Sequence, residues 1–309
     1  MNRHRIAAII VTYNRKGLLA VCLNAIGKQT YKPTVAYVVD NASMDGTDEW
    51  IRANGYDGVK YGVEYRYVRL SENIGGSGGF YTGLKTAYEA KDHFDAFWLL
   101  DDDGVPAPDQ LQKLQERLGE RDYLSPLVVA KENQGRISFG VKPTIQDFLE
   151  QKGVKDGLID NTSFPLNGVL YSRRLVEKVG YPIKEMFIWG DEANYHWRCK
   201  ENGFASAVVV DAIHVHPADR QQQEVILRDH KIVVPTQDWK LYCFMRNMLY
   251  NIRTLHLFRH PLWYVSQLVL YYFVYFTFYS FNWRRLGIVY RAMLDGYRKD
   301  LGRLEKYRN

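Results

Sequence analysis

Apolar runs alternate with helix-like segments along the first third of the chain. Runs with a strand pattern cover residues 6–11, 35–39, 65–70 and 95–100, and helices are predicted over residues 16–26, after the capping residues 43–48, and over residues 80–90. A run without polar interruption is expected of a strand that is buried on both faces of a parallel sheet. The alternation predicts an α/β fold with a doubly wound sheet, mixed or mostly parallel and flanked by helices.

Polar residues follow each predicted strand. In a doubly wound sheet, ligands bind beyond the carboxyl ends of the strands, where the strand order reverses. Thr12 can offer backbone groups to the edge of a base, and Asp40 can accept hydrogen bonds from a base N–H or a ribose hydroxyl. The alternative for Asp40 is a structural role in its turn. Asn14 is expected to cap the helix over residues 16–26.

Three consecutive carboxylates, Asp101, Asp102 and Asp103, end the fourth predicted strand. Like charges this close repel each other, so such a cluster is stable mainly when a hard divalent cation lies among the oxygens. The alternative is a solvated acidic turn. The other polar strand ends and a second acidic pair later in the chain, Asp191 and Glu192, favour the metal interpretation.

A glycine-rich segment, Asn73-Ile-Gly-Gly-Ser-Gly-Gly79, separates the third predicted strand from the next helix. Without side chains, its backbone can lie close to a phosphate or a sugar, and the amino end of the following helix favours anions. The segment matches neither the dinucleotide fingerprint in context nor the phosphate loop that ends in Gly-Lys-Ser/Thr. A flexible turn without a ligand is the alternative.

Three motifs together resemble glycosyltransferase family 2, whose nucleotide-sugar-binding fold is called GT-A. They are Ile-Ile-Val-Thr-Tyr-Asn-Arg over residues 9–15, Val-Val-Asp-Asn-Ala-Ser-Met-Asp-Gly-Thr over residues 38–47, and Leu-Asp-Asp-Asp over residues 100–103. The resemblance covers residues 5 to about 217. Residues 72–80 and Trp-Gly-Asp-Glu over residues 189–192 look like the galactofuranosyltransferase branch, although rhamnosyltransferases share much of this pattern.

The resemblance implies specific roles for the matching residues. Asp101 and Asp103 would hold Mn²⁺ or Mg²⁺ against the donor diphosphate, where the cation stabilises the charge on the leaving group, and Asp102 would lie nearer the donor sugar or ribose. The residues expected to bind the nucleotide-sugar donor are Thr12, Asn14, Arg15, Asp40, Asn73, Gly75, Gly76, Asp101 and Asp102. The residues expected to contact the transferred sugar or the acceptor are Gly78, Gly79 and Trp189, with core packing as the alternative for Trp189.

The acidic pair Asp191 and Glu192 follows an aromatic turn and opens a predicted helix. First-turn acids are also expected from the helix dipole alone. The resemblance implies that Glu192 is the general base that deprotonates the acceptor hydroxyl, with Asp191 supporting it, in a single inverting displacement. Many family members carry Asp at the base position, so the reverse assignment stays open.

Two histidines, His214 and His216, follow the predicted strand over residues 205–210. Alternate positions on a strand share one face, as metal ligands sometimes do. The resemblance implies one further metal ligand here, and the spacing from the acidic pair favours His216 over His214. A structural hydrogen-bonding role is the alternative for both.

The composition, with 25% charged and 46% hydrophobic residues in 309, is that of a globular protein. Three scattered cysteines exclude a disulfide framework or a cysteine-based zinc site, and no apolar segment precedes the first strand, which predicts a cytoplasmic location. The net charge of +6 favours an anionic partner. A basic nucleic-acid-binding or membrane-binding protein without catalysis is the alternative class, but no nucleic-acid-binding motif is present, so we expect no nucleic-acid partner.

The C-terminal part of the chain has a different character. Residues 262–281 carry no charge and are rich in aromatic residues, which predicts helices that lie on an anionic membrane surface or form a homo-oligomer contact. An entirely structural helical cap is the alternative, and a membrane span is less favoured than either. The arginines expected to face lipid phosphate are Arg259, Arg284, Arg285, Arg291 and Arg298. We predict a catalytic domain over residues 1–217 and a helical appendage over residues 218–309, attached to the inner face of the cytoplasmic membrane.

The resemblance to the galactofuranosyltransferase branch implies metal-dependent, inverting transfer of galactofuranose from UDP-galactofuranose to a hydroxyl group of a growing bacterial glycan. The element Tyr-x-x-x-Arg-Asn over residues 242–247 also occurs in relatives that extend lipid-linked glycans. This resemblance implies a polyprenyl-diphosphate-linked acceptor in O-antigen, capsule or cell-wall assembly. A rhamnosyltransferase or another family 2 hexosyltransferase that uses a UDP- or dTDP-sugar is the alternative.

Overall fold

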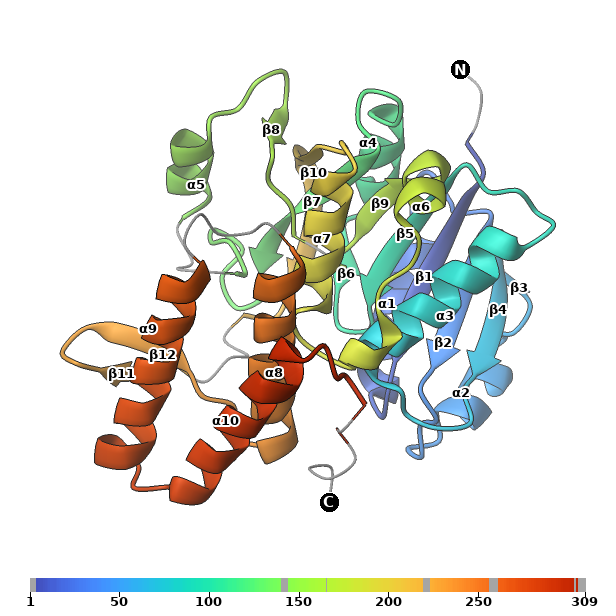
Figure 1. The fold of residues 1–309 in the computed structure, drawn as a ribbon. Coiled ribbons are helices and arrows are strands. Elements are labelled where there is room, and N and C mark those ends of the chain that lie inside the picture. The colour runs from blue at the N-terminus through green and yellow to red at the C-terminus, as the bar shows by residue number, and fades with distance from the viewer. Residues whose placement is uncertain are drawn as a thin grey trace. The chain divides into compact units, whose positions relative to one another are not determined.

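A mixed, mostly parallel β-sheet forms the centre of the larger part of the protein (Figure 1). The computed structural model describes residues 4–139, 144–164, 166–218, 223–255, 261–302 and 304. Within these residues the strand order is β3-β4-β2-β1-β5-β9-β7-β10-β6, and β8 pairs with β10. The strands are β1 (Ile6–Thr12), β2 (Val35–Asp40), β3 (Val59–Lys60), β4 (Val63–Arg69), β5 (Ala96–Asp101), β6 (Val105–Pro106), β7 (Tyr123–Ala130), β8 (Leu158–Asp160), β9 (Val169–Ser172) and β10 (Ser206–His216).

Helices cover both faces of this sheet. Leu19, Cys22 and Ile26 of α1 pack with Ile6, Ala8 and Ile10 of β1. The alternate β1 residues, Ile9 and Val11, contact α3 on the opposite face. The helices of this part are α1 (Lys16–Gly27), α2 (Thr47–Ala53), α3 (Gly75–Glu89), α4 (Gln110–Glu116), α5 (Ile145–Lys152) and α6 (Arg173–Val179). Strands such as β1 are covered by helices on both faces, and this explains why their sequences are unbroken apolar runs. The predicted α/β class is confirmed.

Local boundaries differ from the predicted ones at three places. Helix α3 begins at Gly75, so most of the glycine-rich segment is helix and not loop. Asn14 does not cap α1, because its side chain accepts a hydrogen bond from Met44 N at 2.7 Å. Strand β10 continues through a register shift between Val209 and Ile213 and includes both histidines instead of ending before them.

The parallel strands bring their carboxyl ends to one edge of the sheet. Strand β1 pairs in parallel with β2 on one side and β5 on the other, so the chain reverses its direction of winding beside β1. The register places Thr12 beside Asp40 and Val11 beside Asp101. Strand β10 runs in the same direction, because β9 is antiparallel to both β5 and β7 and β10 is parallel to β7. The end of β10 therefore reaches this edge as well.

The contacts divide the chain into two compact units, Met1–Lys184 with Arg198–Ala218, and Glu185–Trp197 with Asp219–Asn309. The sequence analysis assigns Asp191 and Glu192 to the N-terminal domain, whereas in the structure their segment groups with the C-terminal helices. The remaining elements are η1 (Lys184–Met186), α7 (Asp191–Glu201), β11 (Gln223–Ile226), β12 (His230–Val233), α8 (Asp238–Thr254), α9 (Pro261–Val274), the π-helical η2 (Tyr275–Tyr279) and α10 (Trp283–Tyr297).

The second unit has an apolar core of its own, built from α8, α9, η2, α10 and the β11–β12 hairpin. The uncharged run over residues 262–281 is divided between α9, η2 and the turn that precedes α10. Among the described helices, none combines the length and the apolar character that crossing a membrane requires. The prediction that Arg285 faces lipid phosphate is wrong, since its side chain is 15% exposed and binds Asp238; Arg259 lies outside the described residues.

Candidate functional site

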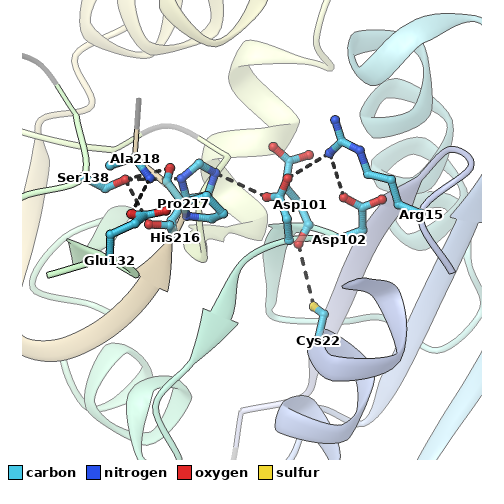
Figure 2. A network of polar contacts seen from close by, with 10 residues as sticks. Arg15, Cys22, Asp101, Asp102, Glu132, Ser138, His216, Pro217 and Ala218 are labelled. Atoms are coloured by element: carbon cyan, nitrogen blue, oxygen red, sulfur yellow. Dashed lines mark hydrogen bonds and ion pairs between the residues drawn. The ribbon is translucent and has the colours of Figure 1, made fainter. Parts of the chain in front are cut away.

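Two carboxylates of the turn after β5 are buried in a network with β1 and α1. Asp102 and Asp103 are 2% and 4% exposed. Thr12 Oγ1 donates to Asp102 Oδ2 at 2.8 Å, and Arg15 Nη1 lies 2.8 Å from Asp103 Oδ2. Arg15 Nη1 also lies 3.1 Å from Asp102 Oδ1 (Figure 2). The pKa of Asp102 is raised to about 6, mainly by burial; Arg15 opposes this shift, and the neighbouring Asp103 contributes to it. A buried, hydrogen-bonded cluster of this kind excludes the solvated acidic turn.

His216 at the end of β10 completes a cluster that could hold a metal ion. One ligand atom each from Asp101, Asp103 and His216 lies within 4.8 Å of the others, and His216 Nε2 is 3.3 Å from Asp103 Oδ1. His216 Nδ1 is 3.3 Å from Ser138 Oγ, which fixes the ring with Nε2 toward the carboxylates (Figure 2). An outer hydrogen bond of this type orients metal-binding histidines. Two hard carboxylates with one imidazole fit a divalent cation such as Mn²⁺.

His214 lies on the same face of β10 but outside this cluster. Its Nδ1 is 3.0 Å from Gln110 Oε1, and the ring is fully buried. A Cβ atom on Gly104 would lie 2.2 Å from His214 Nε2, so the ring packs directly against the backbone that follows the three aspartates. Burial lowers the pKa of His214 to about 3, which keeps it neutral. The structure therefore gives His214 a structural place beneath the acidic turn.

Asp40 is a third buried carboxylate at the same edge of the sheet, and it is fully inaccessible to solvent. Its Oδ1 accepts from Ser43 N at 2.9 Å, and its Oδ2 accepts from Tyr67 Oη at 2.5 Å. Burial and the Asp40 carboxylate raise the pKa of Tyr67, so the phenol keeps its proton and donates. With these two bonds, Asp40 stabilises the turn that follows β2. Its contact with a nucleoside stays a prediction.

The glycines of α3 have a packing explanation. A Cβ on Gly79 would lie 2.5 Å from Val11 Cγ1, and a Cβ on Gly78 would lie 2.6 Å from Ile74 Cγ1. Both glycines are buried, and this close approach explains them without the predicted sugar contact. Gly76 is different, because no atom lies within 4 Å of its Cβ position, and Asn73 Oδ1 caps the segment by accepting from Gly75 N at 2.9 Å.

The predicted base residues lie in the second unit, at the start of α7. Asp191 is 4% exposed, and Glu192 is half-buried. The backbone before them is unusual, with φ of +67° at Phe187, +60° at Trp189 and +86° at Gly190. The Trp189 indole meets the Phe244 ring edge-on at 6.1 Å between centroids and remains half-exposed.

Sequence reasoning missed the residues that support these groups. Ser138 and Gln110 orient the two histidines, yet they are 78 and 104 positions away from them in the chain. No local pattern marks such partners, because only tertiary packing brings α4 and the segment after β7 against β10. Asn247 and Asn251 bind the backbone before the acidic pair. The motif over residues 242–247 includes Asn247, but the sequence does not show which groups this side chain binds.

Comparison with known proteins places this geometry in a family. The family model described as "Glycosyl transferase family 2" matches residues 7–180. The chain belongs to glycosyl transferase family 2. It is therefore a glycosyltransferase, and use of a nucleotide-sugar donor follows from membership of this family. The matched region contains the β1, β2 and β5 motifs on which the sequence resemblance rests.

Relatives within the family narrow the comparison. The chain is 27% identical over 232 residues to galactofuranosyltransferase GlfT1 of Mycolicibacterium smegmatis, covering 72% of this chain and 74% of that protein. It is 27% identical over 229 residues to GlfT1 of Mycobacterium tuberculosis H37Rv, covering 71% and 72%. An undecaprenyl-phosphate mannosyltransferase of Micrococcus luteus is 30% identical over 122 residues, covering 39% and 46%. The likeness to the galactofuranosyltransferase branch is confirmed.

Solved structures share the fold. Crystal structures of S. aureus TarS 1-349 align with a TM-score of 0.59 in complex with UDP-GlcNAc and 0.53 in complex with UDP, both at 16% identity. They cover 98% and 96% of this chain and 83% and 88% of those chains. A further TarS structure aligns with a TM-score of 0.56 at 17% identity over 89% of this chain, which spans 44% of that longer protein. At this identity the likeness supports the GT-A-like fold alone.

Proposed function

We propose that the protein transfers a sugar from a nucleotide-sugar donor to a glycan hydroxyl with inversion, and that the reaction depends on a divalent metal. The observation that carries this proposal is the cluster of Asp101, Asp103 and His216 at the carboxyl edge of a family 2 sheet. The mixed oxygen and nitrogen donors favour Mn²⁺ over Mg²⁺. When bound there, the cation would act as the Lewis acid that stabilises the negative charge on the departing nucleoside diphosphate.

The residues around this cluster would bind and orient the donor. The Arg15 side chain is 46% exposed while its guanidinium holds Asp102 and Asp103, so its exposed N–H groups can donate to a diphosphate oxygen. Asp102 receives a hydrogen bond from Thr12 and would face the ribose or the sugar. Asn14, Asp40, Asn73, Gly75 and Gly76 complete the proposed donor site.

In the second unit, Glu192 would remove the proton from the acceptor hydroxyl while Asp191 orients it. A sugar hydroxyl is a poor nucleophile at neutral pH, so general base catalysis contributes roughly 10²–10⁴-fold in rate. Glu192 is the more exposed of the two carboxylates, which suits contact with an acceptor. Trp189 is half-exposed beside the pair and would stack on the acceptor sugar.

The best-supported donor is UDP-galactofuranose, because the relatives that match most of the chain are named galactofuranosyltransferases. A rhamnosyl or other hexosyl donor is the alternative. A panel of UDP- and dTDP-sugars, assayed with Mn²⁺ for binding and for slow donor hydrolysis, tests this choice. Turnover of UDP-galactofuranose alone supports the proposal, and exclusive turnover of another sugar nucleotide contradicts it.

Two substitutions test the residue roles. Asp103→Ala should abolish metal-dependent donor binding, whereas Asp211→Ala, which removes an exposed carboxylate on the same strand β10 as His216, should not. Glu192→Gln should keep donor binding and lose transfer. Wild-type donor binding by Asp103→Ala would remove the cluster from the mechanism, and wild-type transfer by Glu192→Gln would show that the base is not Glu192.

We also propose that the second unit attaches the enzyme to the anionic inner face of the cytoplasmic membrane, where it meets a polyprenyl-diphosphate-linked acceptor. Large side chains are exposed in and beside η2, namely Phe278 at 62%, Phe281 at 73% and Trp283 at 60%. The hairpin tip adjoins them, since Leu227 N donates to Tyr279 Oη at 3.0 Å. The exposed cations beside this apolar patch are Arg228, Lys231 and Arg284.

Exposed aromatic side chains together with exposed cations fit the boundary of an anionic bilayer. Flotation with vesicles of phosphatidylglycerol and phosphatidylcholine tests this assignment. The double variant Phe278→Ser, Phe281→Ser should lose binding, whereas Tyr290→Ser, an exposed aromatic control on α10, should keep it. A dimer in analytical ultracentrifugation that the double variant abolishes, without vesicle binding by the wild type, would assign the patch to a second copy instead.

A further inference from the structure

The backbone that leads into the acidic pair adopts conformations that ordinary residues avoid. Phe187 and Trp189 have φ of +67° and +60°, in the left-handed region that favours glycine, and Gly190 follows with φ of +86°. Such conformations persist only when surrounding contacts impose them. The contacts come from one helix of the same unit, α8.

Asn247 of α8 holds three carbonyl groups of this turn. Its Nδ2 lies 2.9 Å from Met186 O, 3.0 Å from Ile188 O and 2.6 Å from Trp189 O. The fully buried Asn247 amide therefore binds carbonyl groups before and after Phe187, and the carbonyl group of Trp189 itself. No other residue type of this size offers an amide N–H₂ to the carbonyls and an oxygen to a second donor.

Asn251, one helical turn further on, holds the next carbonyl and the helix itself. Its Nδ2 donates to Gly190 O at 2.8 Å, and its Oδ1 accepts from Asn194 Nδ2 at 2.9 Å. Asn194 belongs to α7, the helix that Asp191 and Glu192 open. Residues four positions apart share one helix face, so Asn247 and Asn251 can donate to the consecutive carbonyls of Trp189 and Gly190.

Arg246 binds both Asn247 and the start of the same turn. Its Nη2 donates to Glu185 O and Met186 O at 3.0 Å each, its Nη1 donates to Leu301 O at 2.7 Å, and its Nε donates to Asn247 Oδ1 at 3.0 Å. Arg246 is fully buried, and its guanidinium lies over the Tyr242 ring. The motif Tyr-x-x-x-Arg-Asn thus has its Arg and Asn engaged with the protein's own backbone, and these side chains do not present a surface to a lipid-linked acceptor.

We propose that Arg246, Asn247 and Asn251 are positioning residues, which form a clamp that orients the Asp191–Glu192 pair for proton abstraction. This role rests on the proposed function of the pair as the base. General base catalysis requires the carboxylate within hydrogen-bond reach of the hydroxyl, and a displacement of about 1 Å can cost on the order of 10²-fold in rate. The clamp fixes the five carbonyls of residues 185, 186 and 188–190 that precede this carboxylate pair.

Asn247→Asp tests the clamp with an isosteric change that removes the donating amide. Leu241→Ala is the control, because Leu241 is a fully buried residue of α8 in the apolar core, and its truncation lowers stability without removing any side-chain hydrogen bond to the turn. Hydrogen exchange of residues 185–192 should accelerate in Asn247→Asp and not in Leu241→Ala. Unchanged exchange in a folded Asn247→Asp protein would overturn the clamp, whatever the substrate proves to be.

Kinetics separate positioning from a general loss of structure. With UDP-galactofuranose as donor and octyl galactofuranoside as acceptor, Asn247→Asp should lower kcat by roughly 10²-fold and leave the KM for the donor within about twofold. In a Glu192→Gln background it should cause no further loss, since the group that it positions is already absent. An equal loss in both backgrounds, or a loss no larger than that of Leu241→Ala, overturns the positioning role.

A second variant keeps the proposal testable if the first variant does not fold. If Asn247→Asp fails to fold, Asn251→Asp is judged by the same criteria, since it removes the amide bond to Gly190 O. Absence of wild-type turnover with this donor would count against the proposed function and leave the exchange measurement to decide the clamp. Wild-type transfer by Glu192→Gln would count against the base, and the two failures are therefore distinguishable.

Discussion

Replacing Gly79 by alanine tests whether the glycine-rich segment serves packing or the substrate. The new Cβ would lie 2.5 Å from Val11 Cγ1 and 3.0 Å from Asn41 Nδ2. Carbon atoms pack at about 3.5–4.0 Å, so α3 must move outward by about 1 Å or more from the sheet. Overpacking of this kind costs about 1–3 kcal/mol, and removing a helical glycine returns about 1 kcal/mol. With so short a contact we expect a net loss of about 1–2 kcal/mol.

Gly76→Ala is the matched control in the same helix. No atom lies within 4 Å of its Cβ position, so only the helix-propensity gain of about 0.5–1 kcal/mol remains. Thermal unfolding should therefore separate the two variants by roughly 5 °C, with Gly79→Ala the less stable. The reasoning is refuted if Gly79→Ala is as stable as Gly76→Ala. If it is equally stable and also loses donor binding, the sugar contact predicted from the sequence replaces packing as the explanation.

Three further outcomes follow from the same structure. In α10, Gly296→Ala would place a Cβ 2.2 Å from the backbone oxygen of Arg246 and should lower the midpoint of urea unfolding, whereas Gly287→Ala, with open space around it, should raise it. Ser138→Ala removes the hydroxyl beside His216 Nδ1 and should weaken Mn²⁺ binding about 10–100-fold in calorimetry; unchanged affinity would separate His216 from the metal. Chelation should abolish transfer, with Mn²⁺ restoring it better than Mg²⁺ in a UDP-release assay.

The sequence determined the class of the fold and the parts of the site that are close together along the chain. Continuous apolar runs predicted β1, β2 and β5, because strands that are buried on both faces of a parallel sheet are rich in apolar residues. Polar strand ends predicted a ligand edge, since parallel strands bring their carboxyl ends together. The sequence alone identified the three consecutive aspartates as a charge cluster, because adjacent residues stay close together in any fold.

Only the tertiary structure decided what depends on distant partners. His214 and His216 share one strand face and one residue type, but Gln110 and the buried turn enclose the first, while Ser138 orients the second toward Asp103. Burial is a property of the packed whole, so the sequence could favour His216 only through the spacing in the family resemblance and could not show which ring is enclosed.

The glycine-rich segment and the Tyr-x-x-x-Arg-Asn element show the same limit. The sequence predicted a ligand contact for the glycines and linked the second element to a lipid-linked acceptor. In the structure Gly79 accommodates β1, while Arg246 and Asn247 bind the chain's own carbonyls. A small or polar residue suits a ligand and a neighbouring backbone equally well. Which of them it meets is decided by how the helices pack, and this packing depends on contacts between residues that are tens of positions apart in the sequence.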